Sequence, residues 1–111
     1  MKHLRPFNEN HDHQLLKIEK SPIHGLGLFT EQDLKKGQIV CEIGNISEMD
    51  GSDRWMTRIS RFVNHNSYPN SRVRIDGDRC YIESVSDISS GEEITTDYRK
   101  IPEFLDQTIY Q

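Results

Sequence analysis

Apolar residues along this chain fall in short runs that predict strands more often than helices. Within residues 14–20, Leu16 and Ile18 alternate with charged neighbours, as in a half-buried strand. Asp76 and Gly77 separate two later runs and are a strong signal for a hairpin turn. The runs that we expect to form strands are residues 14–20, 38–43, 71–75, 80–85 and 93–96. They predict a mostly β fold of short strands and small sheets with little helix.

One segment has a helical spacing instead of an alternating one. Trp55, Ile59 and Phe62 stand at positions i, i+4 and i+7, which predicts a short amphipathic helix or helical turn with Trp55 as a core aromatic. Polar and glycine-marked stretches predict turns or loops between the strands, at residues 21–22, 33–37, 44–52 and 89–91.

Length favours a single folded domain. A chain of 111 residues is the size of one domain and buries only about 60–70% of its unfolded surface, so a site is expected at the domain edge or between subunits. We expect a flexible leader over residues 1–13, a folded domain over residues 14–100 and a tail over residues 101–111. In the tail, Pro102 stands at a predicted helix start, followed by apolar residues on one face: Phe104, Leu105 and Ile109.

Charge and hydropathy limit the partners. The formal net charge of −4 disfavours a duplex nucleic-acid binder and is compatible with a basic peptide partner, although it also serves plain solubility. No run approaches the ~18 apolar residues of a membrane span, and residues 1–13 lack the apolar core of a secretory signal. We therefore expect an intracellular protein without direct nucleic-acid or membrane contact.

Cysteines and histidines give no metal-site spacing. Cys41 and Cys80 form no CxxC pair and stand in apolar runs, so buried thiols in a reducing compartment are expected, while a single disulfide stays open. His11 and His13 have no third ligand nearby and are interpreted as part of a solvated segment. No metal is expected.

Two polar segments carry the candidate chemistry. Residues 61–70 read RFVNHNSYPN, which bends the backbone and offers many donors and acceptors. Residues 91–98 read GEEITTDY and place Tyr98 after a short strand, where its phenol can be aimed into a cleft. We expect the two segments to meet around a polar ligand. Taken alone, Asn64 and His65 are better explained as a capped turn that satisfies buried backbone groups.

A third segment, residues 24–29, reads HGLGLF. Its two glycines permit close backbone approach, but it lacks the third glycine and the helix of a dinucleotide-binding turn. In this order the three segments resemble those of SET-domain protein lysine methyltransferases, because residues 61–70 are similar to RFxNHSCxPN and residues 91–98 to GEELTxDY. The resemblance covers residues 15–98, and the length is similar to that of the minimal, virus-encoded members.

The resemblance implies a SET-domain fold in which the C-terminal part is threaded through a loop in a knot-like arrangement. It implies S-adenosylmethionine as methyl donor, a lysine of a protein or peptide as acceptor, and Tyr98 as the residue at the transfer site. Phe104, or alternatively Tyr110, is expected to close over the adenine, so that the tail covers the cofactor site. The cofactor contacts implied are Gly25, Leu26, Gly27, Arg61, Phe62, Asn64, His65, Tyr98 and Phe104.

The chemistry suits these residue types. A lysine amine must be neutral to accept a methyl group, and deprotonating it at pH 7 costs roughly 4.6 kcal/mol from a pKa of ~10.4. A narrow apolar channel beside a cationic sulfonium lowers that pKa by desolvation and like-charge repulsion. Tyr98 can then orient the amine without acting as a strong base. Glu92 and Glu93 point to opposite faces of a strand and are interpreted as structural rather than as an acid–base pair.

Three departures from the family pattern shape the remaining expectations. Ser67 stands where many members have a zinc-binding cysteine, which agrees with expecting no metal. The stretch between Val40 and Arg61 is short, so a second protomer could supply one wall of the substrate groove, and a homodimer is a hypothesis. Thr96 replaces a residue that is often aromatic, which favours more than one methyl per lysine. Arg61 and Asp97 are expected to be structural ion-pair partners rather than substrate contacts, and the competing function is a SET-like module that binds cofactor or peptide with little turnover.

Overall fold

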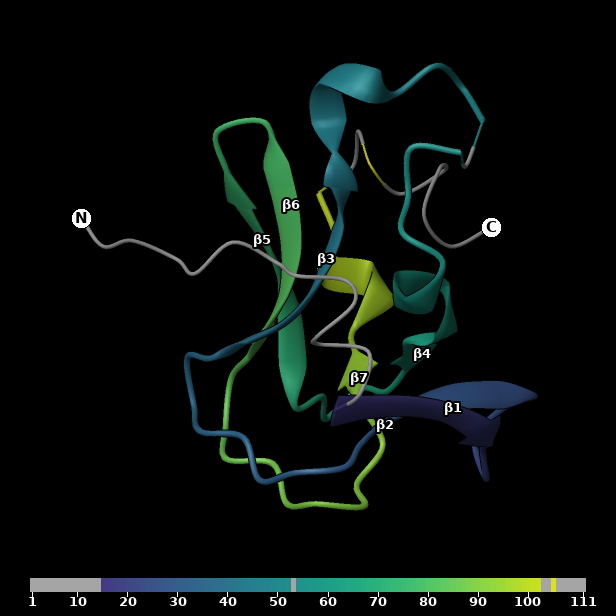
Figure 1. The fold of residues 1–111 in the computed structure, drawn as a ribbon, viewed down its shortest axis with the longest axis vertical. Coiled ribbons are helices and arrows are strands. Elements are labelled where there is room, and N and C mark those ends of the chain that lie inside the picture. The colour runs from purple at the N-terminus through teal and green to yellow at the C-terminus, as the bar shows by residue number, and fades with distance from the viewer. Residues whose placement is uncertain (1–14, 53, 103–104, 106–111) are drawn as a thin grey trace.

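The computed structural model describes residues 15–52, 54–102 and 105, which fold into two sheets (Figure 1). Strands β1 (Leu16–Lys20) and β2 (Leu26–Thr30) form an antiparallel pair. The larger sheet has the order β3-β6-β5-β7-β4, with β3 (Ile39–Asn45), β4 (Asn64–His65), β5 (Ser71–Asp76), β6 (Arg79–Ser84) and β7 (Thr95–Thr96). The named helical elements are short 3₁₀ turns: η2 (Ile46–Glu48), η3 (Ile59–Phe62) and η4 (Tyr98–Lys100). The predicted mostly β fold is confirmed.

The hairpin of β5 and β6 follows the predicted turn closely. Asp76 pairs with Arg79, which leaves Gly77 and Asp78 as the two turn residues. Gly77 has φ +62°, a backbone conformation in which a side chain is disfavoured. A glycine at the first turn position matches the twist that a two-residue hairpin needs. β3 then pairs antiparallel with β6 and completes the regular part of the sheet.

The last strand, β7, lies between two strands that are consecutive in the chain. It pairs in parallel with β4 on one side and through Thr96 with Ser71 of β5 on the other. Figure 1 shows β4 and β7 at the end of the large sheet next to β1 and β2. An isolated bridge between Phe29 and Glu93 joins the small sheet to the segment just before β7. This insertion of β7 between β4 and β5 agrees with the threaded arrangement that the resemblance implies.

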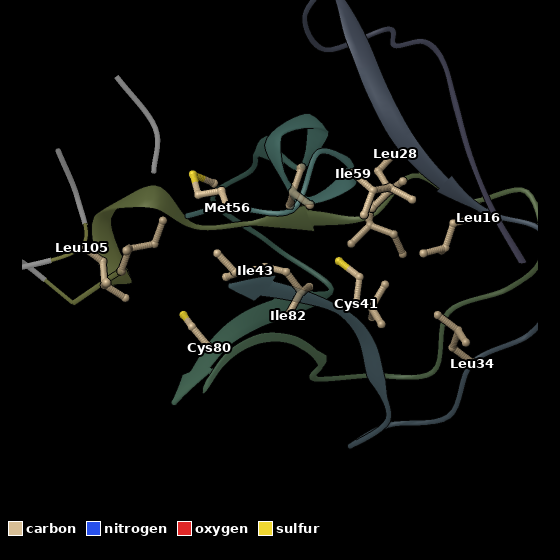
Figure 2. Packing of buried hydrophobic residues seen from close by; sticks show 14 of the residues in the cluster. Leu16, Leu28, Leu34, Cys41, Ile43, Met56, Ile59, Cys80, Ile82 and Leu105 are labelled. Carbon is tan, nitrogen blue, oxygen red and sulfur yellow. The ribbon is translucent and has the colours of Figure 1, made fainter. Parts of the chain in front are cut away.

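The hydrophobic core lies between the sheets and the 3₁₀ turns (Figure 2). Leu28 of β2, Ile43 of β3 and Ile82 of β6 are fully buried in it. Burying each such side chain contributes about 1.5–3 kcal/mol. Cys41 and Cys80 are buried here as well, and no disulfide joins them. Ile101 and Leu105 also belong to the core, so folded structure continues past residue 100.

The structure corrects the predicted loop over residues 44–52. Gly44 and Asn45 continue β3, because they pair with Cys80 and Arg79 of β6. The sequence prediction failed there because a glycine usually signals a break, whereas Gly44 lies against Trp55, where a side chain would collide.

Trp55 is buried but precedes η3, so the predicted helical turn comprises only residues 59–62. The expected strand over residues 93–96 is limited to Thr95 and Thr96, with Glu93 in a single bridge.

Some expectations fall outside the described residues. They concern the leader over residues 1–13, including His11 and His13, and most of the tail, including Phe104, Ile109 and Tyr110. Within the described part of the chain, none of the helices has the length and apolar character needed to cross a membrane.

Candidate active site

The first part of the site is a turn that connects β1 and β2. Ser21 N donates to the Gly25 carbonyl at 2.8 Å, and Ser21 Oγ accepts from Ile23 N at 2.9 Å. Gly25 allows the reversal because its φ is +48°. The turn that Ser21 and Pro22 predicted is thus found, and it presents the carbonyl oxygens of His24 and Leu26 at the start of β2.

Asn64 of β4 bonds to this turn through its side-chain amide. Its Nδ2 donates to the carbonyl oxygens of His24 and Leu26, both at 3.1 Å, and to Glu93 Oε2 at 2.8 Å. One amide nitrogen, in a residue that is 8% exposed, therefore joins the glycine-containing turn, the RFVNHNSYPN segment and the GEEITTDY segment. The sequence predicted that the last two of these segments meet, and the resemblance implied that the glycine-containing turn lies at the same cofactor.

Glu93 occupies the centre of this contact. Ser21 Oγ lies 2.9 and 2.8 Å from its two carboxylate oxygens. A Cβ at Gly27 would come within 2.2 Å of Glu93 Oε2, so the second glycine of HGLGLF makes room for this carboxylate. We call Ser21, Gly27, Asn64 and Glu93 the Glu93 clasp. Gly27 was expected to admit a cofactor, and what it admits here is a side chain of the protein itself.

His65 and Tyr98 lie on the other side of β4, since successive strand residues point in opposite directions. His65 Nδ1 accepts a hydrogen bond from Tyr98 N at 3.0 Å, and the two rings lie 5.1 Å apart. The Tyr98 hydroxyl donates to the Val63 carbonyl at 2.8 Å. Burial raises the pKa of Tyr98 above its usual value, so its phenol is protonated at neutral pH. The Asn64–His65 strand and the Tyr98 hydroxyl thus lie together.

Asn70 and Ser71 fasten the two late segments to each other. Asn70 Nδ2 donates to the Glu93 carbonyl at 2.8 Å, and Asn70 Oδ1 accepts from Thr95 N at 2.9 Å. Ser71 Oγ donates to the Thr95 carbonyl at 2.6 Å. These side chains replace main-chain ladder bonds where β7 is only two residues long. They hold Glu93 and Tyr98 in register with β4.

The other residues predicted for the site differ in exposure, and not all of them lie next to the clasp. Leu26 is half exposed beside the clasp, and Arg61 is exposed at the end of η3. Phe62 is partly buried and packs against the core. Thr96 is buried and its hydroxyl donates to the Ser71 carbonyl, so that group is engaged within the sheet. Phe104 lies outside the described residues.

The other carboxylates near the site have structural contacts. Asp97 is buried and accepts hydrogen bonds from the Arg99 side chain and backbone, which together hold the pKa of the Asp97 carboxyl down to about 2. Glu92 accepts from Ser89 N in a separate turn, so Glu92 and Glu93 do not act on one group. Sequence reasoning missed Ser21 as part of the site, although a serine-proline turn next to HGLGLF was the signal for it.

No metal site is present among the residues that the structure describes: nowhere do three His, Cys, Asp or Glu side chains gather. Burial raises the pKa of the Cys80 thiol to about 12, which makes it a poor nucleophile at neutral pH. The chemistry of the site therefore depends on amide, imidazole, phenol and carboxylate groups.

Comparison with known proteins agrees with this architecture. Residues 45–99 match the SET domain family, a span that includes the RFVNHNSYPN and GEEITTDY segments. The chain is 29% identical, over an alignment of 132 residues that covers 85% of it, to the "Variant-silencing SET domain-containing protein" of Plasmodium falciparum (isolate 3D7). The chain corresponds to 5% of the length of that relative. The matched span is just under half of the chain, and the mostly β fold with β7 between β4 and β5 is consistent with a SET domain.

Proposed function

We propose that this SET domain is an S-adenosylmethionine-dependent protein-lysine methyltransferase with Tyr98 at the transfer site. The observation that carries the proposal is the pair Asn64–His65. Asn64 holds the turn before β2 and Glu93 on one side, while His65 holds the backbone of Tyr98 on the other. Two consecutive residues thus couple a candidate cofactor site to a candidate transfer site.

The groups around Asn64 fit the proposed cofactor. S-adenosylmethionine, when bound, supplies a methyl group on a positively charged sulfur. The carbonyl oxygens of His24 and Leu26, the Asn64 amide and the Glu93 carboxylate are mainly hydrogen-bond acceptors, as a ligand with an ammonium group and a positive charge requires. These residues would hold the cofactor beside β4.

Tyr98 is suited to orient a lysine amine rather than to deprotonate it. Its hydrogen is donated to the Val63 carbonyl, and its raised pKa keeps it protonated at neutral pH. A phenol oxygen can still accept a hydrogen bond while its own hydrogen is donated. Tyr98 can therefore accept from the substrate amine and direct the nitrogen lone pair, and accurate positioning of this kind supplies much of a rate enhancement.

The test is transfer of labelled methyl from S-adenosylmethionine to a panel of basic proteins and peptides. Tyr98→Phe removes the phenol oxygen, and we expect a fall in transfer of about 100-fold because the amine loses its orientation. Tyr81→Phe is the matched control, because Tyr81 lies on β6, two strands away from β7, and is buried where Tyr98 is partly buried. Transfer should be unchanged in that variant.

The outcomes separate the candidate functions. Full activity of Tyr98→Phe would remove Tyr98 from the mechanism. Cofactor binding by the wild-type protein without transfer to any member of the panel would favour the alternative, a SET-like module that binds cofactor or peptide. Absence of cofactor binding would reject the methyltransferase and would leave only a module that binds peptide.

Several finer predictions belong to this proposal. The substrate is a lysine-bearing protein or peptide, with histones as one class in the panel. Thr96 favours more than one methyl per lysine, which mass spectrometry of the product checks. A homodimer is checked by gel filtration with light scattering. The virus-encoded type and an intracellular location stay predictions from the sequence.

A further inference from the structure

Glu93 differs from the other carboxylates that are buried or half-buried in the described part of the chain. Glu83 pairs with Arg72 and Arg74, Glu42 with Arg79, and Asp97 with Arg99. Glu93 is partly buried, yet its oxygens accept only from the Ser21 hydroxyl and the Asn64 amide among the described residues. Its negative charge therefore has no positive partner there. A desolvated charge of this kind favours a cation.

The groups next to Glu93 add to this preference. The carbonyl oxygens of His24 and Leu26 approach the same Asn64 nitrogen as the carboxylate does, so three acceptors share an amide with two hydrogens. Among the described residues, every side-chain hydrogen bond of Asn64 is made by Nδ2, so no donor reaches its Oδ1. The clasp thus has more acceptors than donors. An ammonium group, with three donors and a positive charge, is the complementary ligand group.

The position of the charge is specified by the fold. Gly27 leaves room for Glu93 Oε2 against the backbone of β2, and Asn70 fixes the Glu93 backbone from the other side. An exposed glutamate that merely increased solubility would need neither contact. The carboxylate is therefore held next to the turn that presents the His24 and Leu26 carbonyl oxygens.

We propose that Glu93 is the counter-ion for the α-ammonium group of the cofactor, and that it determines specificity for donors that carry this group. The inference rests on the proposed function, because it needs S-adenosylmethionine as the ligand. It assigns to Glu93 a direct binding role beyond its contribution to the clasp. A sulfonium has no hydrogen to donate, so the acceptors of the clasp select the ammonium and not the sulfur.

The test is a binding cycle that removes the carboxylate charge and the ligand amine separately. Glu93→Gln keeps the shape of the side chain and an oxygen that can accept from Asn64. The ligands are S-adenosylmethionine, S-adenosylhomocysteine and an S-adenosylhomocysteine analogue in which hydrogen replaces the amino group. Dissociation constants are measured by isothermal titration calorimetry. Glu92→Gln is the control, because it makes the same change in net charge one residue away in an exposed turn.

We expect Glu93→Gln to raise the dissociation constants of both amine-bearing ligands by about 5- to 20-fold, as for the loss of a partly screened hydrogen bond to a charged group. The deaminated analogue should bind wild type and Glu93→Gln equally, since the coupling is between the carboxylate and the amine. Glu92→Gln should leave all three constants unchanged. Thermal unfolding of Glu93→Gln with a wild-type midpoint would show that the fold is retained.

Other results would overturn the assignment. An equal rise in the dissociation constants of all three ligands would mean that Glu93 acts only by holding the turn. Weakening of S-adenosylmethionine alone would assign the charge to the sulfonium, and no weakening would remove Glu93 from binding. If wild type binds none of the ligands, the proposed function fails first, and that result is distinct from a wild type that binds all three without coupling.

Discussion

The sheet of β3, β6 and β5 and the region of β4, β7 and the Glu93 clasp are held together in different ways. In the sheet, main-chain ladders run over the full length of β5 and β6, from the Ser71–Ser84 pair to the Asp76–Arg79 pair. In the second region the two strands have two residues each, and side chains bond to the backbone in place of the ladder. Asn64 and Asn70 are the main examples.

This difference predicts where residue identity matters. A ladder uses groups that every residue has, so most sheet positions need only the right polarity and size. The clasp uses one amide for three acceptors, and no other side chain has the same reach and donors. We therefore expect the regular sheet to tolerate substitution more widely than the region around β4, and the following variants test that comparison.

The largest loss of stability is expected from Gly44→Ala. Gly44 belongs to the regular sheet but is an exception to its tolerance of substitution. A Cβ at Gly44 would lie 2.2 Å from the Trp55 carbonyl oxygen, and a backbone atom cannot move as a side chain can. We expect a loss of about 3 kcal/mol, at the upper end for overpacking. Chemical denaturation followed by the fluorescence of Trp55, the chain's one tryptophan, measures it.

Gly51→Ala is the matched control for this variant. Gly51 has φ +88° but open space where a Cβ would stand, so it tests backbone strain without a collision. Its loss should be smaller, about 1–2 kcal/mol. Equal losses in the two variants would contradict the packing argument at Gly44, and a wild-type stability of Gly44→Ala would show that β3 and Trp55 separate easily.

A smaller loss is expected from Asn70→Ala, which tests the side-chain bonds around β7 directly. The variant leaves the Glu93 carbonyl and Thr95 N without their partner, at a cost of about 2 kcal/mol. Asn66→Ala is the control, because Asn66 Oδ1 accepts only from Tyr68 N in an exposed turn. If both variants unfold at the same denaturant concentration, the side-chain bonds of β7 are not what fixes this region.

The sequence predicted the regular sheet because its causes are local. Apolar runs and the Asp76–Gly77 signal were enough to place β1, β3, β5 and β6 to within about two residues, apart from the continuation of β3 through Gly44. That exception depends on Trp55, a contact between distant segments that no local pattern contains.

The site was predictable only through the resemblance of its three segments. Composition and periodicity indicated polar turns at Asn64 and His65 but not their partners. The roles of Ser21 and Glu93 depend on contacts across 72 residues of the chain, and a pattern read along the sequence cannot specify them. The close approach of Gly27 to Glu93 explains the second glycine of HGLGLF without any ligand.

The smallest effect is expected in acid, from Arg99→Gln at the end of the second region. The Asp97 carboxyl has a pKa of about 2 in the folded protein, because the Arg99 side chain and backbone donate hydrogen bonds to it. An unfolded aspartate has a pKa of about 3.9, so the folded value is lowered. The stabilisation is therefore fully present above about pH 4 and is lost as the pH falls towards 2.

Removing the guanidinium raises the folded pKa of Asp97 towards its ordinary value, so Arg99→Gln should begin acid unfolding at a higher pH than the wild-type protein. Arg99 is largely exposed, which makes the shift modest and reduces it further in high salt. Lys100→Gln removes a neighbouring positive charge that forms no ion pair with the Asp97 carboxylate among the described residues. It keeps the backbone bond from Lys100 N to the Asp97 carbonyl, so it should follow wild type. Superimposable acid transitions of the three proteins, followed by Trp55 fluorescence, would show that this pair of charges adds nothing to the bonds that hold β7 and Tyr98 in place.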